Sequence, residues 1–252
     1  MFRWISILGL SGTLGAIVLH YLVFGPKRLP PAGSDGARAT VRRFSIWERL
    51  VHFATASSFV LLAVSGFWPA IAAGDELHGW LWLVHAAAGA VFAVAMVFMT
   101  FSWAMDCRFA PYDWAWVRCF GGYLGGNKHA PADRFNAGQK VFLWHVAAFG
   151  LVTIVTGLGL MAPMFSDAVQ AIVYEVHRYA SLLFLMSILV HLYLGTFANP
   201  GTLRAMIWGT VRREWAELHH PLWRKTGGHS SESGPSEERR QSAQGMGPEK
   251  FD

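Results

Sequence analysis

The chain has 252 residues, of which 53% are hydrophobic and only 15% are charged, whereas charged residues make up about 25% of an average soluble domain. The mean hydropathy is +0.32 although the C-terminal stretch is almost wholly polar, so the apolar residues are concentrated elsewhere. This composition excludes an ordinary water-soluble enzyme. The net charge of +5 fits membrane topology better than nucleic-acid binding, and we expect no nucleic-acid partner.

The first four-fifths of the sequence contains five long apolar segments. A transmembrane helix needs about 20 mostly apolar residues. The segments that meet this requirement are 4–24, 46–68, 80–103, 141–162 and 172–198. Tryptophans stand at the ends of several of them, as expected at a membrane interface. The sequence therefore predicts an all-α membrane protein with five transmembrane helices.

The basic residues are distributed unevenly between the connections. Of the 21 lysines and arginines, nineteen lie in 25–51, in 104–140 or after residue 199, and the other two are Arg3 and Arg178. The positive-inside rule places the three basic stretches in the cytoplasm, with the N-terminus and the short connections outside. The charge pattern thus predicts a cytoplasmic C-terminus and one alternating direction for all five helices.

The first apolar segment could instead be a signal peptide, because Arg3 precedes it. Cleavage would place the basic residues of 26–45 outside, against the charge rule, and the sequence has no A-x-A site after this segment. We therefore expect a retained N-terminal transmembrane anchor over 1–25, followed by a cytoplasmic linker over 26–45.

The C-terminal region divides into two parts by composition. Residues 201–225 mix arginines with tryptophans, which is typical of a cytoplasmic interfacial helix, although a solvated helix against a partner has the same pattern. Residues 226–252 are rich in Gly, Ser, Glu, Arg and Gln, which predicts a disordered tail.

Histidines inside the predicted spans are the main candidates for function, because ionisable groups are costly in hydrocarbon. Six of the 11 histidines fall there, namely His20, His52, His85, His145, His177 and His191, and the other five are expected at the surface. His177 and His191 are fourteen residues apart, or about 3.9 helical turns, which places them on one face about 21 Å apart. Two cofactors could therefore be stacked across the membrane.

Helix direction predicts which histidines lie at the same depth. His52 lies near the cytoplasmic start of its helix. His191 lies farther from the outer surface than His177, and therefore at a depth similar to that of His52. His85 and His177 both lie near the outer surface. We call His52 and His191 the inner pair, and His85 and His177 the outer pair. Two opposing imidazoles are what a b-type haem requires, and they leave its iron without an open position, which suits electron transfer.

Two further histidines have other interpretations. His145 lies at the depth of His52, so it could replace His52 as a ligand, donate a proton to a quinone, or form a hydrogen bond within the bundle. His20 has no partner left at its depth, and a structural role is favoured.

A polar segment precedes the fourth span at the cytoplasmic interface. Asn136 and Gln139 supply amide donors, and Gly138 lets a ligand approach the backbone. A quinone head group, which has two carbonyl acceptors, suits these residues. Asn136 is alternatively a helix N-cap, the commoner role for Asn at a helix start.

Residues 40–225 resemble the gamma subunit of respiratory formate dehydrogenase, a cytochrome b of the four-helix type. The motifs that carry the resemblance are RFSIWERLVHF (43–53), LVHAAAGAVF (83–92), FNAGQKVFLWH (135–145), VHRYASLLFLMSILVHLY (176–193) and AELHHPLW (216–223). The resemblance implies an up-down four-helix transmembrane bundle over 46–200, with one additional N-terminal transmembrane helix that departs from the family pattern.

The resemblance also implies cofactors and partners. It assigns His52 and His191 to the inner haem iron and His85 and His177 to the outer haem iron, and it places Asn136, Gly138 and Gln139 near the quinone. Electrons would come from an iron–sulfur beta subunit and a molybdenum- or tungsten-pterin alpha subunit, which holds the formate chemistry. The location implied is the bacterial inner membrane.

Other functions share parts of this pattern. The same architecture occurs in the cytochromes b of nickel–iron hydrogenases and thiosulfate reductases, which differ in their electron donor. A haem-free membrane anchor or proton-conducting protein belongs to a different class, and it predicts a colourless protein.

Overall fold

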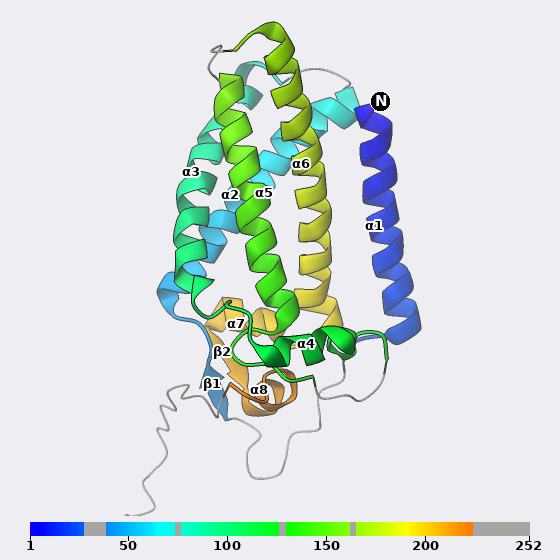
Figure 1. Cartoon of the computed structure of the whole chain (residues 1–252), viewed down its shortest axis with the longest axis vertical. Coiled ribbons are helices and arrows are strands. Elements are labelled where there is room, and N and C mark those ends of the chain that lie inside the picture. Colours follow the sequence, from blue (N-terminus) through cyan, green and yellow to red (C-terminus); the bar gives the residue numbers. More distant parts are fainter. Residues whose placement is uncertain (28–38, 74–76, 126–129, 162–164, 224–252) are drawn as a thin grey trace, which may run out of the picture.

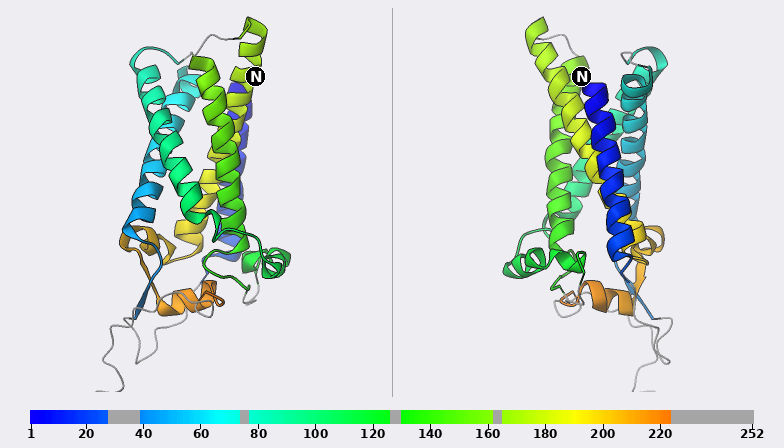
Figure 2. Two further views of the ribbon diagram at one scale, coloured as in Figure 1. Left: turned by 60° about the vertical axis from the view of Figure 1, so that its left-hand side comes forward. Right: turned by 90° about the vertical axis from the view of Figure 1, so that its right-hand side faces the viewer.

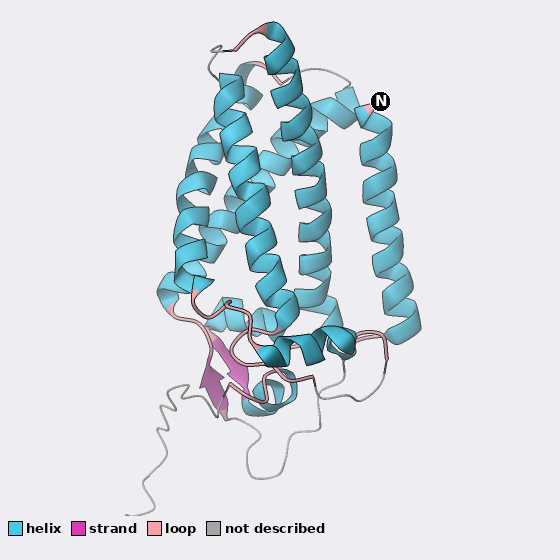
Figure 3. Cartoon of the chain, viewed as in Figure 1, coloured by secondary structure: helices cyan, strands magenta, loops and turns pink. Residues whose placement is uncertain are grey.

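The computed structural model describes residues 1–27, 39–73, 77–125, 130–161 and 165–223, and this part of the chain is mostly helical (Figures 1 and 3). Its helices are α1 (Phe2–Phe24), α2 (Ile46–Trp68), α3 (Gly79–Ala104), α4 (Pro111–Arg118), α5 (Ala137–Met161), α6 (Asp167–Tyr193), α7 (Thr202–Trp208) and α8 (Arg213–His219). A π-helical turn extends α2 over Pro69–Ala73 and α6 over Leu194–Ala198, and Phe120–Gly122 is a 3-10 turn. The strands β1 (Thr40–Arg42) and β2 (Thr210–Arg212) form one antiparallel pair.

Five of the described helices are long and apolar enough to cross a membrane, which confirms the expected fold class. They span Phe2–Phe24, Ile46–Ala72, Gly79–Ala104, Ala137–Met161 and Asp167–Ala198. The fourth span begins earlier than predicted, because Asn136 and Gln139 exchange hydrogen bonds that start α5 at Ala137.

The helices α2, α3, α5 and α6 form an up-down bundle (Figure 2). Within it, α2 packs along α3 and α5 packs along α6, so each pair is a hairpin of consecutive helices. The additional helix α1 lies outside the bundle, next to α6. A Cβ at Gly9 of α1 would lie 3.2 Å from the sulfur of Met186 on α6, so glycine permits this approach.

One end of the bundle carries α4, α7, α8 and the two strands, and we call it the basic end (Figure 1). The stretch 201–225 was expected to be a single helix, but the structure corrects this to α7, β2 and α8. The break occurs at Gly209, whose φ of 75° ends α7. The Gly209 carbonyl accepts hydrogen bonds from the backbone N–H groups of Arg43 and Phe44, and a Cβ here would lie 2.8 Å from the Phe44 carbonyl oxygen. The predicted disordered tail lies outside the described residues.

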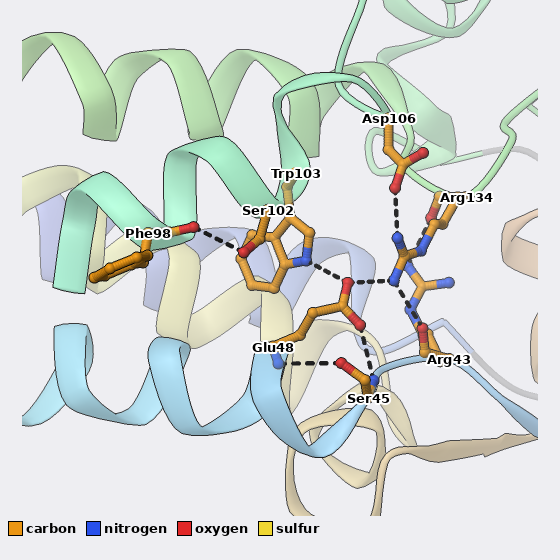
Figure 4. A network of polar contacts seen from close by, with 8 residues as sticks. All are labelled: Arg43, Ser45, Glu48, Phe98, Ser102, Trp103, Asp106 and Arg134. Atoms are coloured by element: carbon orange, nitrogen blue, oxygen red, sulfur yellow. Dashed lines mark hydrogen bonds and ion pairs between the residues drawn. The ribbon is translucent and has the colours of Figure 1, made fainter.

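A polar network fixes the basic ends of α2 and α3 to each other (Figure 4). Ser45 and Glu48 form a capping box that starts α2, and the Trp103 indole N–H donates to Glu48 Oε1 over 2.8 Å. Arg134 bridges Glu48 and Asp106. Because Glu48 lies one turn before His52, the network also fixes the height of the inner pair.

Candidate functional site

The inner pair is brought together by α2 and α6. The rings of His52 and His191 have their centres 6.4 Å apart and their planes 51° apart. His191 also stacks on Phe142, with 4.3 Å between centres and 4° between planes. The Nδ1 atom of His52 is buried and forms no hydrogen bond within the described part of the chain.

The outer pair is brought together by α3 and α6. The ring centres of His85 and His177 are also 6.4 Å apart, with 66° between the planes. Two imidazoles on opposite sides of a metal, with bonds of about 2 Å and each nitrogen about 1.1 Å from its ring centre, would have centres about 6.2 Å apart. The spacing of both pairs would therefore allow one metal to bind both rings of a pair.

A hydroxyl group orients each ring of the outer pair. The Ser65 hydroxyl donates to the Leu61 carbonyl over 2.6 Å, so its oxygen accepts a hydrogen bond from His85 Nδ1, 2.8 Å away. Thr156 does the same, donating to the Val152 carbonyl over 2.6 Å and accepting from His177 Nδ1 at 2.9 Å. Because Nδ1 carries the proton in both rings, the Nε2 lone pairs are available to a metal.

A glycine follows each of these hydroxyl residues and clears space for the ring. A Cβ at Gly66 would lie 3.2 Å from Cε1 of His85, and one at Gly157 would lie 3.3 Å from Cε1 of His177. The first helix of each hairpin thus carries a hydroxyl–glycine dipeptide that supports the outer histidine of the second helix. Neither dipeptide stands out in the sequence alone, and their recurrence beside the histidines is the signal that identifies them.

A cavity of about 760 Å³ adjoins the outer pair. Its lining includes both histidines and both glycines, together with Phe2 of α1 and Arg178 of α6. The volume lies within the usual range for cofactor pockets, about 300–1,000 Å³. No group of three or more His, Cys, Asp and Glu side chains in the described ranges could hold a bare metal ion. Paired histidines beside an apolar cavity suit a metal that is already held in a macrocycle.

The two remaining membrane histidines have separate surroundings. His145 stacks on Phe149, with 4.3 Å between ring centres, and lies 6.2 Å from the ring of Phe184. Of the two candidates on α2 and α5, it is therefore His52 whose ring lies beside that of His191. His20 donates from Nε2 to the Tyr123 carbonyl over 2.9 Å and accepts from the Tyr193 hydroxyl at Nδ1 over 2.6 Å. His20 therefore ties α1 to α6 and to the segment after α4.

Two histidines of the basic end differ from the surface position expected for them. His220 is only 1% exposed and donates from Nδ1 to the Asp133 carbonyl over 2.6 Å. Burial, together with the nearby Arg43, holds the pKa of His220 well below its usual value. Burial likewise lowers the pKa of His219 to about 4. Both rings are therefore neutral at pH 7 and belong to the packing around Trp215.

The predicted quinone residues lie together at the start of α5. Asn136 Oδ1 accepts from the Gln139 backbone N–H over 2.9 Å, and Gln139 Oε1 accepts from the Asn136 N–H over 3.0 Å. Asn136 thus makes the contact of an N-cap. The two side-chain oxygens are used in starting the helix, which leaves the amide NH₂ groups as the donors for a ligand.

Helix α4 covers the same turn of α5. A Cβ at Gly138 would lie 2.7 Å from Cη2 of Trp116, so the close approach that glycine permits here is to an indole ring. Next to it, Lys140 and Asp113 form an ion pair of 2.8 Å with side chains that are 1% and 5% exposed. In the sequence, α4 reads as part of a connection, because its eight residues show no long apolar pattern.

Comparison with known proteins finds relatives that are described as cytochromes b. A family model described as prokaryotic cytochrome b561 matches residues 43–209. The chain is 30% identical over 188 residues to the nitrate-inducible formate dehydrogenase cytochrome b556(Fdn) subunit of Escherichia coli K12, covering 70% of this chain and 86% of that protein. It is 29% identical over 202 residues to the formate dehydrogenase cytochrome b556(fdo) subunit of the same strain, covering 74% and 92%. A formate dehydrogenase cytochrome b556 subunit of Haemophilus influenzae is 32% identical over 117 residues, covering 44% and 49%.

Proposed function

Because the chain belongs to the prokaryotic cytochrome b561 family, and within it to the formate dehydrogenase cytochrome b subunits, we propose that it passes electrons through two b haems to a membrane quinone. It is a multi-pass membrane protein. The observation that carries the proposal is the presence of two histidine pairs with the same 6.4 Å spacing, one toward each end of α6.

Each histidine has a defined role in the proposal. His52 and His191 hold the inner haem iron, and His85 and His177 hold the outer one. Held by two histidines each, the bound haems would supply one-electron transfer and no substrate chemistry. Ser65 and Thr156 keep the outer imidazoles in the tautomer that ligates through Nε2.

The quinone is assigned to the start of α5, where the amide NH₂ groups of Asn136 and Gln139 donate no hydrogen bond within the described residues and Gly138 lies between them in the sequence. This turn lies at the basic end of the bundle (Figure 1), and the inner pair lies in the second turn of α2 and the last turn of α6, toward the same end. The distance for electron transfer from the inner haem to this turn would therefore be short. The amide NH₂ groups would orient the quinone carbonyls.

The direction of the helices follows from their charges. Nineteen of the 21 basic residues lie in the sequence stretches 25–51, 104–140 and after residue 199, which favours a cytoplasmic basic end and an outward N-terminus in the bacterial inner membrane. Oxidation of a donor outside and proton uptake inside would conserve energy as voltage, about 2.3 kcal/mol per charge and 100 mV. The partners are an iron–sulfur beta subunit and a molybdenum- or tungsten-pterin alpha subunit, in which formate is oxidised.

Haem counting in histidine variants tests the assignment. The purified complex should contain two b haems per chain, and His191→Ala and His85→Ala should each contain one. His145→Ala is the matched control, since it removes a membrane histidine outside both pairs, and it should keep two. Retention of two haems in His191→Ala, or loss of one in His145→Ala, would overturn the pairing. A colourless wild-type protein in a reduced-minus-oxidised spectrum would favour the haem-free alternative.

A quinone-site variant tests the second half of the proposal. In Asn136→Ala we expect slower quinone reduction, while the donor still reduces both haems. Unchanged turnover in this variant would remove Asn136 from the site.

A further inference from the structure

Helix α1 lies outside residues 43–209 of the family match, and the proposed function gives it no task. Most of the helix is exposed, as expected for a lipid-facing helix. Its first turn is different, because Phe2 is only 7% exposed. The Phe2 ring lies 6.2 Å from the ring of Phe67 on α2 and packs edge-on against Tyr179 on α6 at 5.3 Å.

The Phe2 ring also lies beneath a charged group. The guanidinium of Arg178 is 4.8 Å from the centre of the Phe2 ring and 5.0 Å from that of Tyr174, and its Nε donates to Glu175 over 2.8 Å. Arg178 and Arg3 are the two basic residues outside the three basic stretches. A basic residue on the side of the membrane where the charge rule disfavours it calls for a local reason.

Arg178 forms an ion pair with Glu175, and it also lines the cavity of about 760 Å³ beside the outer pair, together with Phe2, His85 and His177. The rest of its wall is mainly apolar. The cavity thus combines two iron ligands, one guanidinium and a ring from a helix outside the bundle. A b haem has an apolar macrocycle and two carboxylate side chains, so it matches this lining.

We propose that the first turn of α1 completes the outer haem pocket: Phe2 closes its wall and supports the guanidinium of Arg178, which receives a haem carboxylate. The inference rests on the proposed function, because it assumes a haem between His85 and His177. It goes further by assigning a binding role to Arg178 and to a helix that the family match does not include.

Both contacts favour the reduced haem. Reduction lowers the positive charge at the iron, so a nearby guanidinium makes reduction easier. Exclusion of water also makes reduction easier, because water solvates the more charged oxidised iron. Loss of either contact should therefore lower the midpoint potential of the outer haem. The inner haem, toward the other end of α6, should be unaffected.

A redox titration of the purified full complex tests this. The midpoint potential that is missing in His85→Ala is that of the outer haem. We expect Phe2→Ala and Arg178→Gln each to lower the outer potential and to leave the inner one unchanged. Leu8→Ala is the matched control on the same helix, because Leu8 is 72% exposed, and it should leave both potentials as they are. Phe2→Ala should also speed oxidation of the reduced outer haem by ferricyanide, a hydrophilic oxidant.

The outcomes separate this inference from the proposed function. Fewer than two haems in the wild-type complex would refute the proposed function. Two haems, with an outer potential and ferricyanide rate unchanged in Phe2→Ala and Arg178→Gln, would refute the pocket role of α1. If Phe2→Ala does not accumulate, Phe2→Leu keeps the apolar volume but removes the ring beneath the guanidinium. It should lower the outer potential in the same direction, and an unchanged potential would count against the inference.

Discussion

The buried ion pair between Lys140 and Asp113 is expected to hold α4 against the start of α5. Their charged atoms are 2.8 Å apart, and the side chains are 1% and 5% exposed. At an effective dielectric constant of about 20 their attraction is about 6 kcal/mol, which offsets a desolvation cost of several kcal/mol per ion. Removal of one partner leaves the other charge buried alone, which costs about 3–5 kcal/mol. We expect Asp113→Ala and Lys140→Met each to lower the free energy of unfolding by this amount.

A double-mutant cycle separates the pair from its surroundings. The Asp113→Ala, Lys140→Met double variant has no uncompensated charge, so its cost should be smaller than that of either single change. What remains is mainly the lost acceptor for the Ala110 N–H, about 1 kcal/mol. Unfolding of the detergent-solubilised complex, followed by haem absorbance, measures each step. Asp106→Ala is the control, because its ion pair with Arg134 is 41% exposed on the aspartate side and should contribute less than about 1 kcal/mol. Additive single effects, or single effects no larger than this control, would refute the reasoning.

Three other predictions follow from the site. Gly157→Ala should weaken binding of the outer haem, because its Cβ would lie 3.3 Å from the His177 ring, whereas Gly12→Ala, with open space around it, should not; haem content after dilution compares them. Gln139→Ala should raise the KM for quinone by removing an amide donor and loosening the first turn of α5, with haem content unchanged; an unaltered KM would contradict this. Since burial lowers the pKa of His219 from 6.5 to about 4, the unfolded chain binds the proton first, so stability should fall between pH 6.5 and 4. The protection of amides in 210–223 against hydrogen exchange, measured relative to the intrinsic exchange rate at each pH, should fall in this window, and less so in His219→Gln.

The transmembrane helices were predictable because hydropathy acts over whole helices. The alternating direction expected from charge gave relative depths that match His52 with His191 and His85 with His177, and the structure brings these rings together. The reason is geometric. In an up-down bundle, position along the chain converts directly into depth, at about 1.5 Å per residue.

Contacts that depend on lateral packing were not predictable in the same way. The break at Gly209 depends on Phe44, far away in the sequence, and a lone glycine among arginines and tryptophans does not reveal this. The contact of Trp116 with Gly138 depends on α4 folding back on α5. Depth also could not separate His145 from His52, because both lie a short way from the basic ends of their helices, α5 and α2.

The two hairpins explain why both pairs include α6. Consecutive antiparallel helices pack together, so α2 and α3 form one unit and α5 and α6 the other. Each histidine pair takes one member from each unit: His52 and His85 from the first, His191 and His177 from the second. In the proposed cytochrome the two haems therefore join the hairpins at two depths. A ligand that binds only the assembled state stabilises it, so loss of the outer haem should loosen the hairpins at that end of the bundle and leave each hairpin itself intact.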